Sequence, residues 1–391
     1  MSKNFVSLKG FYLCKMKTWY GANFKVGMVG GGQLGRMFIQ EAMNYDVQVH
    51  CLDPDHEAPC KYLAHSCTVG SLNDYETLYN FGLDKDVITV EIENVNIEAL
   101  EALEQLGKRV FPQPRVLRII KDKGIQKQFY QDHDLPTAPF KLIENPEQLQ
   151  LPCVQKMRTG GYDGKGVQVL RETADLDRAF TTPSIAEELI PFTKELSVIV
   201  ARNEQGEMVA YPAVECEFNP HANLVEFLFA PAAISAELEE KAQQLARDVI
   251  DKLDMVGILA VEMFVTEDGK LLINEIAPRP HNSGHHTIEC NVTSQFEQHL
   301  RSILNLPLGS TEIIQHGAMI NLLGAEGHQG PVYYKGLEKL MTYKGVHVHL
   351  YGKALTKPYR KMGHVTISAQ SMEEVKTTAS RIKDCLHIIS I

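Results

Sequence analysis

The sequence predicts a mixed α/β and α+β chain of three domains: an open parallel sheet flanked by helices, a larger α+β domain, and a small β-rich domain. Its 391 residues exceed what one hydrophobic core usually organises. Strand-like and helix-like segments alternate from Phe24, the composition changes after residue 120, and short strand-like segments dominate from residue 311.

These changes place the domain boundaries. We assign residues 1–23 to an N-terminal extension, 24–120 to the α/β domain, 121–310 to the α+β domain and 311–391 to the β-rich domain. In the first domain, apolar residues at Leu34, Phe38 and Ala42 predict a helix between two buried strands. The second domain should contain two strands around a glycine-rich loop, then a long helix over 234–253 and a hairpin over 257–276.

The composition excludes several classes of protein. Thirty-nine basic and 49 acidic residues give a net charge of −10, the wrong sign for a protein that binds nucleic-acid phosphates. No apolar run approaches the roughly 18 residues of a membrane span, and residues 1–23 lack the apolar stretch of a signal peptide. The eight cysteines include no Cys-x-x-Cys pair, which predicts free thiols. We therefore expect a cytoplasmic protein with no nucleic-acid or membrane partner.

A glycine cluster follows the first predicted strand and opens the first helix. Residues 30–35 fit the pattern G-x-G-x-x-G, and Asp53 ends the second strand. Such glycines let a phosphate approach backbone amides at a helix N-terminus, as in a Rossmann-like domain. Three interpretations stay open here: an NAD-dependent dehydrogenase, another phosphate-bearing ligand, or a tight turn without a ligand.

A second glycine-rich segment, residues 156–166, lies between two strand-like runs, so we expect a hairpin loop. No Gly-Lys-Ser/Thr opens a helix here, which excludes a Walker A motif. Four glycines among residues 160–166 make a flap able to fold over phosphates, and Lys156 would supply a positive charge. The alternative is a flexible surface loop.

Two glutamates can be placed from the predicted hairpin geometry. If residues 268–269 form a two-residue turn, Glu267 faces Lys270. In the same register Glu262 faces Glu275. Opposed carboxylates repel unless a cation lies between them, and such a pair beside nucleotide phosphates suits Mg²⁺. The alternative, two solvated surface glutamates, is disfavoured by their apolar neighbours.

A polar loop follows this hairpin. Residues 277–286 place Arg, His, Asn and Ser side chains between prolines and a glycine, and these donors suit an oxyanion substrate. Its histidines, His281, His285 and His286, leave a zinc cluster as an alternative, although a thiol ligand is missing from the loop.

A basic cluster stands out near the end of this acidic chain, formed by Lys353, Lys357, Arg360 and Lys361. It predicts either a pocket for a phosphorylated small substrate or a solvated turn with ordinary surface lysines.

In this order the segments resemble the ATP-grasp ligases, which combine a nucleotide-like α/β domain, a lysine before a glycine-rich flap, two metal-binding glutamates and a small C-terminal domain. GGGQLGRM, RTGGYDGKG, INEIAPRPHNSGH with SQFEQHLR, and YGK followed by YRKMGHV are more closely similar to the N5-carboxyaminoimidazole ribonucleotide synthetases. The resemblance runs from residue 24 to the C-terminus. It implies a Rossmann-like N-terminal domain followed by an ATP-grasp central domain.

The resemblance implies ATP-dependent carboxylation of 5-aminoimidazole ribonucleotide in purine synthesis. ATP would phosphorylate bicarbonate to carboxyphosphate, and the exocyclic amine would take up the carboxyl group. The products would be ADP, phosphate and the N5-carbamate. The family also implies Mg²⁺ and a homodimer. Two alternatives are another ATP-grasp ligase acting on a phosphoribosyl substrate and an NAD-dependent oxidoreductase.

The resemblance further implies roles for individual residues. Those implied for ATP are Lys123, Lys156, Gly161, Tyr162, Asp163, Gly164, Lys165, Gly166, Val167, Glu187, Glu188, Leu189, Ile190, Glu195, Asn274 and Glu275. Those implied for the metal are Glu262 and Glu275, and those for bicarbonate and carboxyphosphate are Arg158, Arg279 and His281. Those implied for the ribonucleotide are Gln33, Leu34, Glu91, Asn282, Ser283, Lys353, Arg360 and Lys361, with the glycine cluster meeting its phosphate or ribose.

Three positions depart from the family pattern. Lys123 stands where some relatives have Arg, which keeps the charge but loses the bidentate fork. Phe218 falls near a family histidine that approaches the nucleotide, so that contact stays unassigned. Ala277 replaces an Asn of many ATP-grasp enzymes, so a second metal ion would be held less fully.

Overall fold

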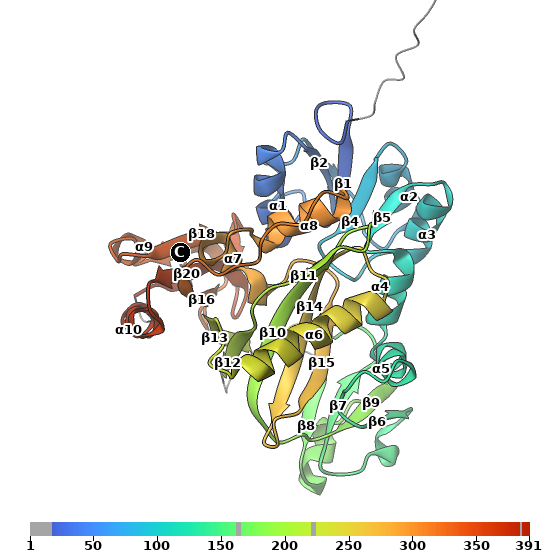
Figure 1. Ribbon diagram of the computed structural model, residues 1–391, viewed down its shortest axis with the longest axis vertical. Coiled ribbons are helices and arrows are strands. Elements are labelled where there is room, and N and C mark those ends of the chain that lie inside the picture. Colours follow the sequence, from blue (N-terminus) through green and yellow to red (C-terminus); the bar gives the residue numbers. More distant parts are fainter. Residues whose placement is uncertain (1–17, 162–165, 220–223, 384) are drawn as a thin grey trace, which may run out of the picture.

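The computed structural model of the protein describes residues 18–161, 166–219, 224–383 and 385–391. These residues form four sheets. Figure 1 shows the N-terminal sheet at the top, the four-stranded sheet of the central region at the bottom, and the C-terminal strands on the left of a long central sheet. The flap residues Tyr162, Asp163, Gly164 and Lys165 lie outside the described residues, as does the side chain of Phe218.

The first domain is an open parallel sheet with the strand order β3-β2-β1-β4-β5, which confirms the predicted architecture. Buried apolar residues line both of its faces. Its strands are β1 (Lys25–Val29), β2 (Gln48–Asp53), β3 (Ser66–Val69), β4 (Val87–Val90) and β5 (Arg109–Phe111), and its helices are α1 (Gln33–Asn44), α2 (Tyr75–Gly82), α3 (Ile97–Gln105) and α4 (Pro114–Lys121).

The central region contains two sheets. A four-stranded antiparallel sheet has the order β6-β9-β7-β8, and its β7–β8 hairpin is the one predicted around the glycine-rich loop. Its elements are α5 (Lys123–Asp132), β6 (Phe140–Ile143), η1 (Pro146–Gln148), β7 (Cys153–Met157), β8 (Val167–Leu170), η2 (Thr173–Arg178) and β9 (Ser184–Glu188). The long sheet begins with β10 (Phe192–Arg202), β11 (Met208–Ala210), β12 (Val214–Asn219), β13 (Leu224–Ala230), β14 (Gly257–Thr266) and β15 (Leu271–Ala277), with helix α6 (Ala236–Lys252).

The C-terminal strands extend the central sheet. Strand β13 pairs with β16, so the sheet runs in the order β15-β14-β10-β12-β13-β16-β20-β18. A further sheet has the order β19-β17-β21. The remaining elements are η3 (Asn282–Gly284), α7 (Thr287–Cys290), α8 (Gln295–Ile303), β16 (His316–Leu323), β17 (Gly330–Lys335), α9 (Leu337–Leu340), β18 (Val346–Leu350), β19 (Leu355–Thr356), β20 (Lys361–Ala369), α10 (Met372–Ile382) and β21 (His387–Ser390).

Packing across domains fixes helix α8 in place. Helix α6 covers one face of the central sheet, and the apolar side chains between them form the largest core cluster. On the other side, Phe296 and Leu300 of α8 pack into the core that contains Phe38 of α1. The His299 Nε2 lies 2.9 Å from the Thr89 hydroxyl of the first sheet. Within the described residues, no helix is long and apolar enough to cross a membrane.

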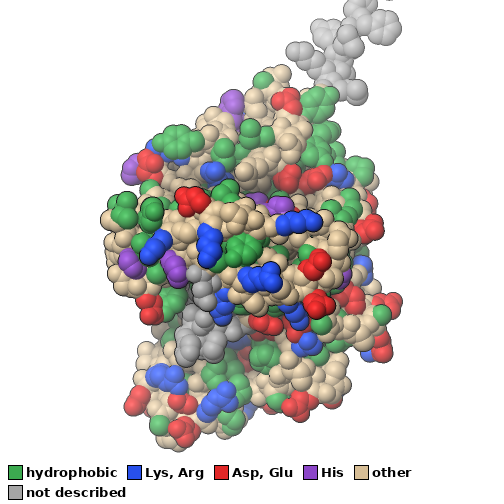
Figure 2. Space-filling view, turned by 90° about the vertical axis from the view of Figure 1, so that its left-hand side faces the viewer, with side chains coloured by type: hydrophobic (Ala, Val, Ile, Leu, Met, Phe, Trp, Pro, Cys, Tyr) green, Lys and Arg blue, Asp and Glu red, His purple; other side chains and the backbone are tan. Residues whose placement is uncertain are grey.

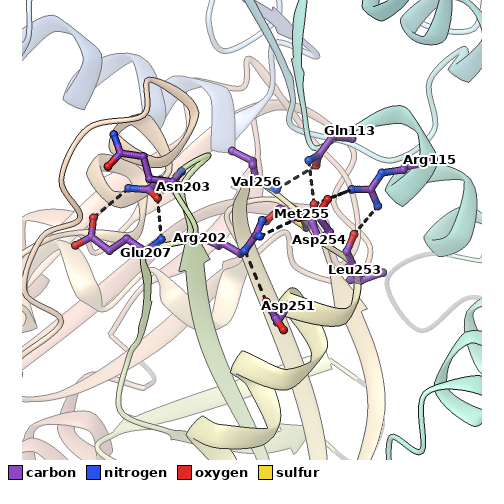
Figure 3. A network of polar contacts seen from close by, with 11 residues as sticks. Gln113, Arg115, Arg202, Asn203, Glu207, Asp251, Leu253, Asp254, Met255 and Val256 are labelled. Carbon is purple, nitrogen blue, oxygen red and sulfur yellow. Dashed lines mark hydrogen bonds and ion pairs between the residues drawn. The ribbon is translucent and has the colours of Figure 1, made fainter.

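A polar network joins the first domain to the central sheet (Figure 3). Its centre is Asp254, just after α6, whose backbone φ of +45° is uncommon for a residue with a side chain. Arg115 donates hydrogen bonds to the carbonyl oxygens of Leu253 (2.6 Å) and Asp254 (2.8 Å). Arg115 also pairs with one carboxylate oxygen of Asp254 at 2.8 Å, and Arg202 approaches the other at 2.8 Å. A cation thus meets the last carbonyl groups of a long helix, where it is electrostatically favourable.

We expect Arg115→Ala to lower the free energy of unfolding by about 1 kcal/mol, because the Leu253 carbonyl loses its donor and Asp254 loses one of its cationic partners. The melting temperature should fall by roughly 2–4 °C. Arg178→Ala is the control, since Arg178 is largely exposed and its ion pair among the described residues is with Asp175, three residues away. Equal melting temperatures for the Arg115 variant and the unmodified protein would contradict this role.

Candidate active site

The hairpin of β14 and β15 brings two glutamates together, as predicted, although its turn differs from the prediction. The Thr266 amide donates to the Lys270 carbonyl (2.9 Å), so the loop has three residues and Glu267 does not face Lys270. A bulge then leaves Asn274 without a partner in β14 and restores the register, so that Glu262 pairs with Glu275. Two departures from the expected pairing therefore cancel at the functional position.

A third carboxylate, Glu195 of β10, belongs to the same cluster. Burial, followed by the charges of Glu275 and Glu195, raises the pKa of Glu262 to about 8. Burial likewise raises the pKa of Glu195 to about 7, and the Asn274 amide lies 3.4 Å from its carboxylate. The mutual effect on these pKa values shows that the three carboxylates share one electrostatic environment.

Two lysines reach this cluster from separate segments. Lys123, the first residue of α5, places its Nζ 2.6 Å from the Glu275 carboxylate. Partial desolvation raises the pKa of Glu275, but Lys123, Lys156 and His281 together outweigh it, and the pKa lies below its ordinary value. Lys156 of β7 is buried and donates to the Asn274 Oδ1 at 2.9 Å. The two lysines predicted for ATP therefore face the two glutamates predicted for the metal.

A third lysine, which the sequence analysis did not assign, completes this arrangement. Glu187 is buried between Lys127 and Lys156, with an ammonium group 2.8 Å from each carboxylate oxygen. The Glu187 side chain is thus engaged by lysines, so Glu187 itself can offer only its backbone groups for the predicted contact with adenine. Burial lowers the pKa of Lys127 to about 8 against the opposing effect of Glu187. Lys127 lies four residues after Lys123 on α5, and this spacing places both lysines on the same face of the helix. That spacing is the feature of the sequence from which the role of Lys127 could have been predicted.

The glycine-rich hairpin closes beside this cluster. The Met157 amide donates to the Gly166 carbonyl (2.8 Å), and Gly166 has a φ of +87°. A β-carbon on Gly166 would lie 3.0 Å from the Gly161 Cα, so the two ends of the loop touch and glycine is required there. Val167 begins β8 directly after this contact.

The loop after β15 places His281 next to the glutamates. The His281 Nε2 lies 3.8 Å from Glu262 Oε1, and its Nδ1 lies 2.9 Å from the Ser283 hydroxyl. The Ser283 hydroxyl also meets Ser197 at 2.7 Å and is buried, so its predicted contact with substrate would compete with these partners. The Asn282 Oδ1 is buried without a hydrogen-bond partner among the described residues, which suits a ligand that donates a hydrogen bond.

The zinc alternative for the three histidines is wrong. His285 contacts Gln295, and His286 Nδ1 contacts the Ser283 carbonyl, so the rings do not converge. Burial holds the pKa of His286 at about 4 and that of His285 well below its ordinary value. Among the described residues, no group of three or more His, Cys, Asp or Glu side chains is arranged to hold a metal ion.

The two arginines predicted for bicarbonate lie in different surroundings. Arg158 forms a two-point contact with Asp122, at 3.0 and 2.8 Å, beside a cavity of about 380 Å³. Arg279 lies beyond β15 with its Nε 2.9 Å from the Glu93 carboxylate, a residue that the sequence analysis did not single out. The described contacts thus bring Arg279, but not Arg158, to the edge of the first domain.

In this structure the glycine cluster holds the protein's own carboxylates, and the contact with a phosphate or ribose stays a prediction. Glu91 accepts hydrogen bonds from the amides of Gly32 and Gly35, the latter at 2.6 Å. Asp53 accepts one from Gly31 at 2.7 Å. A β-carbon on Gly30 or Gly32 would lie 2.4 Å from Glu91, so the glycines permit this close approach.

The remaining residues predicted for the ribonucleotide are only partly brought together. Gln33 opens α1, whereas the Leu34 side chain is buried in the core. Lys353 donates to the Lys361 carbonyl (2.7 Å), and Lys361 is close enough to oppose the rise in the pKa of Glu262. Arg360 donates to the Leu355 carbonyl at 2.6 Å. Figure 2 shows Lys and Arg side chains gathered across the middle of the face that carries the C-terminal strands.

Comparison with known proteins places this geometry in a family. Residues 24–121 match the ribonucleotide synthetase preATP-grasp domain, 128–296 the ATP-grasp domain, and 317–378 the phosphoribosylaminoimidazole carboxylase C-terminal domain. The N5-carboxyaminoimidazole ribonucleotide synthase of Bacillus subtilis is 38% identical over 89% of this chain and 92% of its own. The chain belongs to the N5-carboxyaminoimidazole ribonucleotide synthase family.

Solved structures of the synthase family share the whole fold. The synthetase of Thermotoga maritima is 40% identical, with a TM-score of 0.88 over 94% of this chain and 100% of its own. The synthase of Aspergillus clavatus, solved in complex with ADP and 5-aminoimidazole ribonucleotide, is 33% identical, with a TM-score of 0.86 over 94% of this chain and 99% of its own. The ATP-grasp fold predicted from the sequence is therefore confirmed.

The carboxylate cluster predicts an unusual effect on stability. The folded protein binds the Glu262 proton more tightly than the unfolded chain, so this group's stabilisation is present at acid pH and is lost as the pH rises toward about 8. We expect Glu262→Gln to raise the free energy of unfolding of the ligand-free protein at pH 8.5, on the order of 2 kcal/mol.

Thermal melts between pH 5 and 8.5 test this, and the difference from the unmodified protein should grow with pH. Glu267→Gln on the exposed loop of the same hairpin is the control and should change little. A Glu262 variant no more stable than the unmodified protein at pH 8.5 would show that the cluster is not under electrostatic strain.

Proposed function

We propose that this ATP-dependent ligase carboxylates 5-aminoimidazole ribonucleotide with bicarbonate, forming N5-carboxyaminoimidazole ribonucleotide, ADP and phosphate. The observation that carries the proposal is the facing of Glu262 and Glu275 between lysines and the His281 loop. Negative groups that lie opposite each other beside lysines suit a metal–phosphate complex, and the adjacent donors suit a small oxyanion. Relatives named for this activity span nearly the same length.

Mg²⁺ fits the pair Glu262 and Glu275, because a divalent cation would relieve the repulsion that raises the pKa of Glu262. When bound with ATP, the metal neutralises phosphate charge and favours phosphoryl transfer. Lys123 and Lys156 would bind phosphate oxygens, with Asn274 orienting Lys156. Glu195 would accept the ribose hydroxyls, and residues 161–167 would close over the phosphates.

The carboxylation step would take place beside His281. Bicarbonate oxygen attacks the terminal phosphate of ATP, ADP leaves, and carboxyphosphate forms. The exocyclic amine of the ribonucleotide then takes up the carboxyl group and releases phosphate. Arg279 and His281 would hold the anionic oxygens, with His281 placed to accept a proton of the amine. Because carboxyphosphate is short-lived in water, closure of the glycine-rich hairpin is part of this proposal.

The ribonucleotide would bind between the first domain and the C-terminal strands. Lys353, Arg360 and Lys361 would meet its phosphate, because the amides of the glycine cluster are already bonded to Glu91 and Asp53. Asn282 would contact the base or ribose through its unpaired Oδ1. Cytoplasmic location and a homodimer belong to the proposal as family properties.

The proposal is tested by measuring ADP release while bicarbonate, formate or 5-aminoimidazole ribonucleotide is added or omitted. ADP should form with bicarbonate and the ribonucleotide and should not respond to formate. Release driven by formate with another phosphoribosyl amine would instead support the alternative ligase.

Glu275→Gln should reduce ADP formation at least 100-fold at saturating Mg²⁺, because one of the two metal carboxylates loses its charge at nearly constant shape. Glu267→Gln is the matched control on the same hairpin. Near-native turnover by the Glu275 variant would show that the metal assignment is wrong.

Lys353→Ala should raise KM for the ribonucleotide about 10-fold or more and leave KM for ATP within about twofold, because only the phosphate of that substrate would meet this lysine. Steady-state kinetics with each substrate varied in turn decides the matter. Equal changes in both KM values would contradict separate binding regions.

A further inference from the structure

A buried glutamine holds His281 by its backbone. Gln295, the first residue of α8, is fully buried and accepts a hydrogen bond from the His281 amide at 2.9 Å. Its side-chain amide donates to the His281 carbonyl at 2.8 Å and lies 3.1 Å from His285 Nδ1. One side chain therefore satisfies both backbone groups of a single residue, as a neighbouring strand would.

We propose that Gln295 is a positioning residue that fixes His281 beside Glu262 for the carboxylation step. This inference rests on the proposed function, since His281 acts there on the reacting carboxyl group. The His281 ring has its own support from Ser283 at 2.9 Å, so the ring orientation depends on where the backbone lies. A displacement of about 1 Å at a reacting centre typically costs up to about 100-fold in rate.

The surroundings of Gln295 leave its side chain little freedom to move. A β-carbon on Gly284 would lie 2.4 Å from the Gln295 Oε1, so the loop passes over the glutamine at a distance that only glycine allows. The backbone N–H of Gln295 donates to the Thr287 hydroxyl at 2.8 Å, which also fixes the start of α8. Helix α8 is packed between the first domain and the central sheet. Through Gln295, the backbone of His281 is therefore attached to the core of the protein.

The same helix supplies a matched control. Gln298 is also fully buried, and its side chain pairs with both backbone groups of Gly309, at 2.9 and 3.1 Å. Gly309 lies outside the described polar cluster around Glu262. Loss of either glutamine removes two equivalent bonds to the backbone of a loop, and loss of Gln295 also removes the contact with His285. Only Gln295 holds a residue of the proposed site.

The experiment compares Gln295→Met with Gln298→Met in the full-length protein. Both variants should lose melting temperature to a similar degree. Gln295→Met should lower kcat for ribonucleotide-dependent ADP formation by about 10- to 100-fold and leave KM for ATP within about twofold. Gln298→Met should keep kcat within about twofold. Equal losses of kcat in the two variants, or an unchanged kcat in the Gln295 variant, would overturn the proposal.

A double-mutant cycle separates positioning from general damage. In a His281→Ala background, Gln295→Met should lower the residual kcat by less than about twofold, because the side chain that it positions is gone. The same further loss in both backgrounds would overturn the proposal. If Gln295→Met does not fold, the nearly isosteric pair Gln295→Glu and Gln298→Glu replaces it, with the same expected results.

A spectroscopic measurement keeps this inference distinct from the proposed function. The NMR signal of the His281 ring, assigned by its absence in His281→Ala, should shift in the Gln295 variant and stay unchanged in the Gln298 variant. An unshifted signal would overturn the positioning role. If the unmodified protein forms no ADP with bicarbonate and the ribonucleotide, the proposed function fails, whereas the NMR comparison still reports on Gln295.

Discussion

Three glutamates that share one electrostatic environment impose the main constraint on this structure. Glu195, Glu262 and Glu275 lie on adjacent strands, and burial together with mutual repulsion raises the pKa of Glu262 to about 8. Such an arrangement lowers the stability of the ligand-free protein. Clusters of this kind are typical of sites that bind a cation together with phosphates. The rest of the site is organised around this excess of negative charge.

The sheets hold the opposing charges at a fixed distance from the glutamates. Lys156 comes from the small sheet, and it shares the buried Glu187 with Lys127 of helix α5. From the other side, the continuous central sheet runs from β15 to β20, which carries Lys361. The positive groups therefore come from helices and strands of the sheets, and the glycine-rich hairpin is the segment proposed to close over the phosphates.

The sequence predicted most of this fold because its patterns were local. The alternation of strands and helices gave the first domain, and the hairpin at residues 257–276 gave the facing of Glu262 and Glu275. That pairing was correct although the turn was not, since a three-residue loop and a bulge at Asn274 compensate each other. The bulge has no signature in the sequence.

The sequence left contacts unassigned where a residue's partner lies far away in the chain. The glycine pattern at residues 30–35 indicates close approach to an anion, and only the fold reveals that the anion is Glu91 of a neighbouring strand end. Lys127 and Gln295 read as ordinary helix residues because their roles depend on Glu187 and His281. Tertiary pairing of this kind is invisible to spacing rules, whereas the resemblance to a family predicted binding residues without their geometry.

The most direct test of the electrostatic account is the number of protons released when Mg²⁺ and a non-hydrolysable ATP analogue bind at pH 7.5. Calorimetry in two buffers of different ionisation enthalpy measures this number. The account predicts a release of about half a proton or more from the unmodified protein, because Glu262 must ionise, and a clearly smaller release from Glu262→Gln. Equal proton release by the two proteins would contradict the claim that the strained carboxylate cluster is the metal–phosphate site.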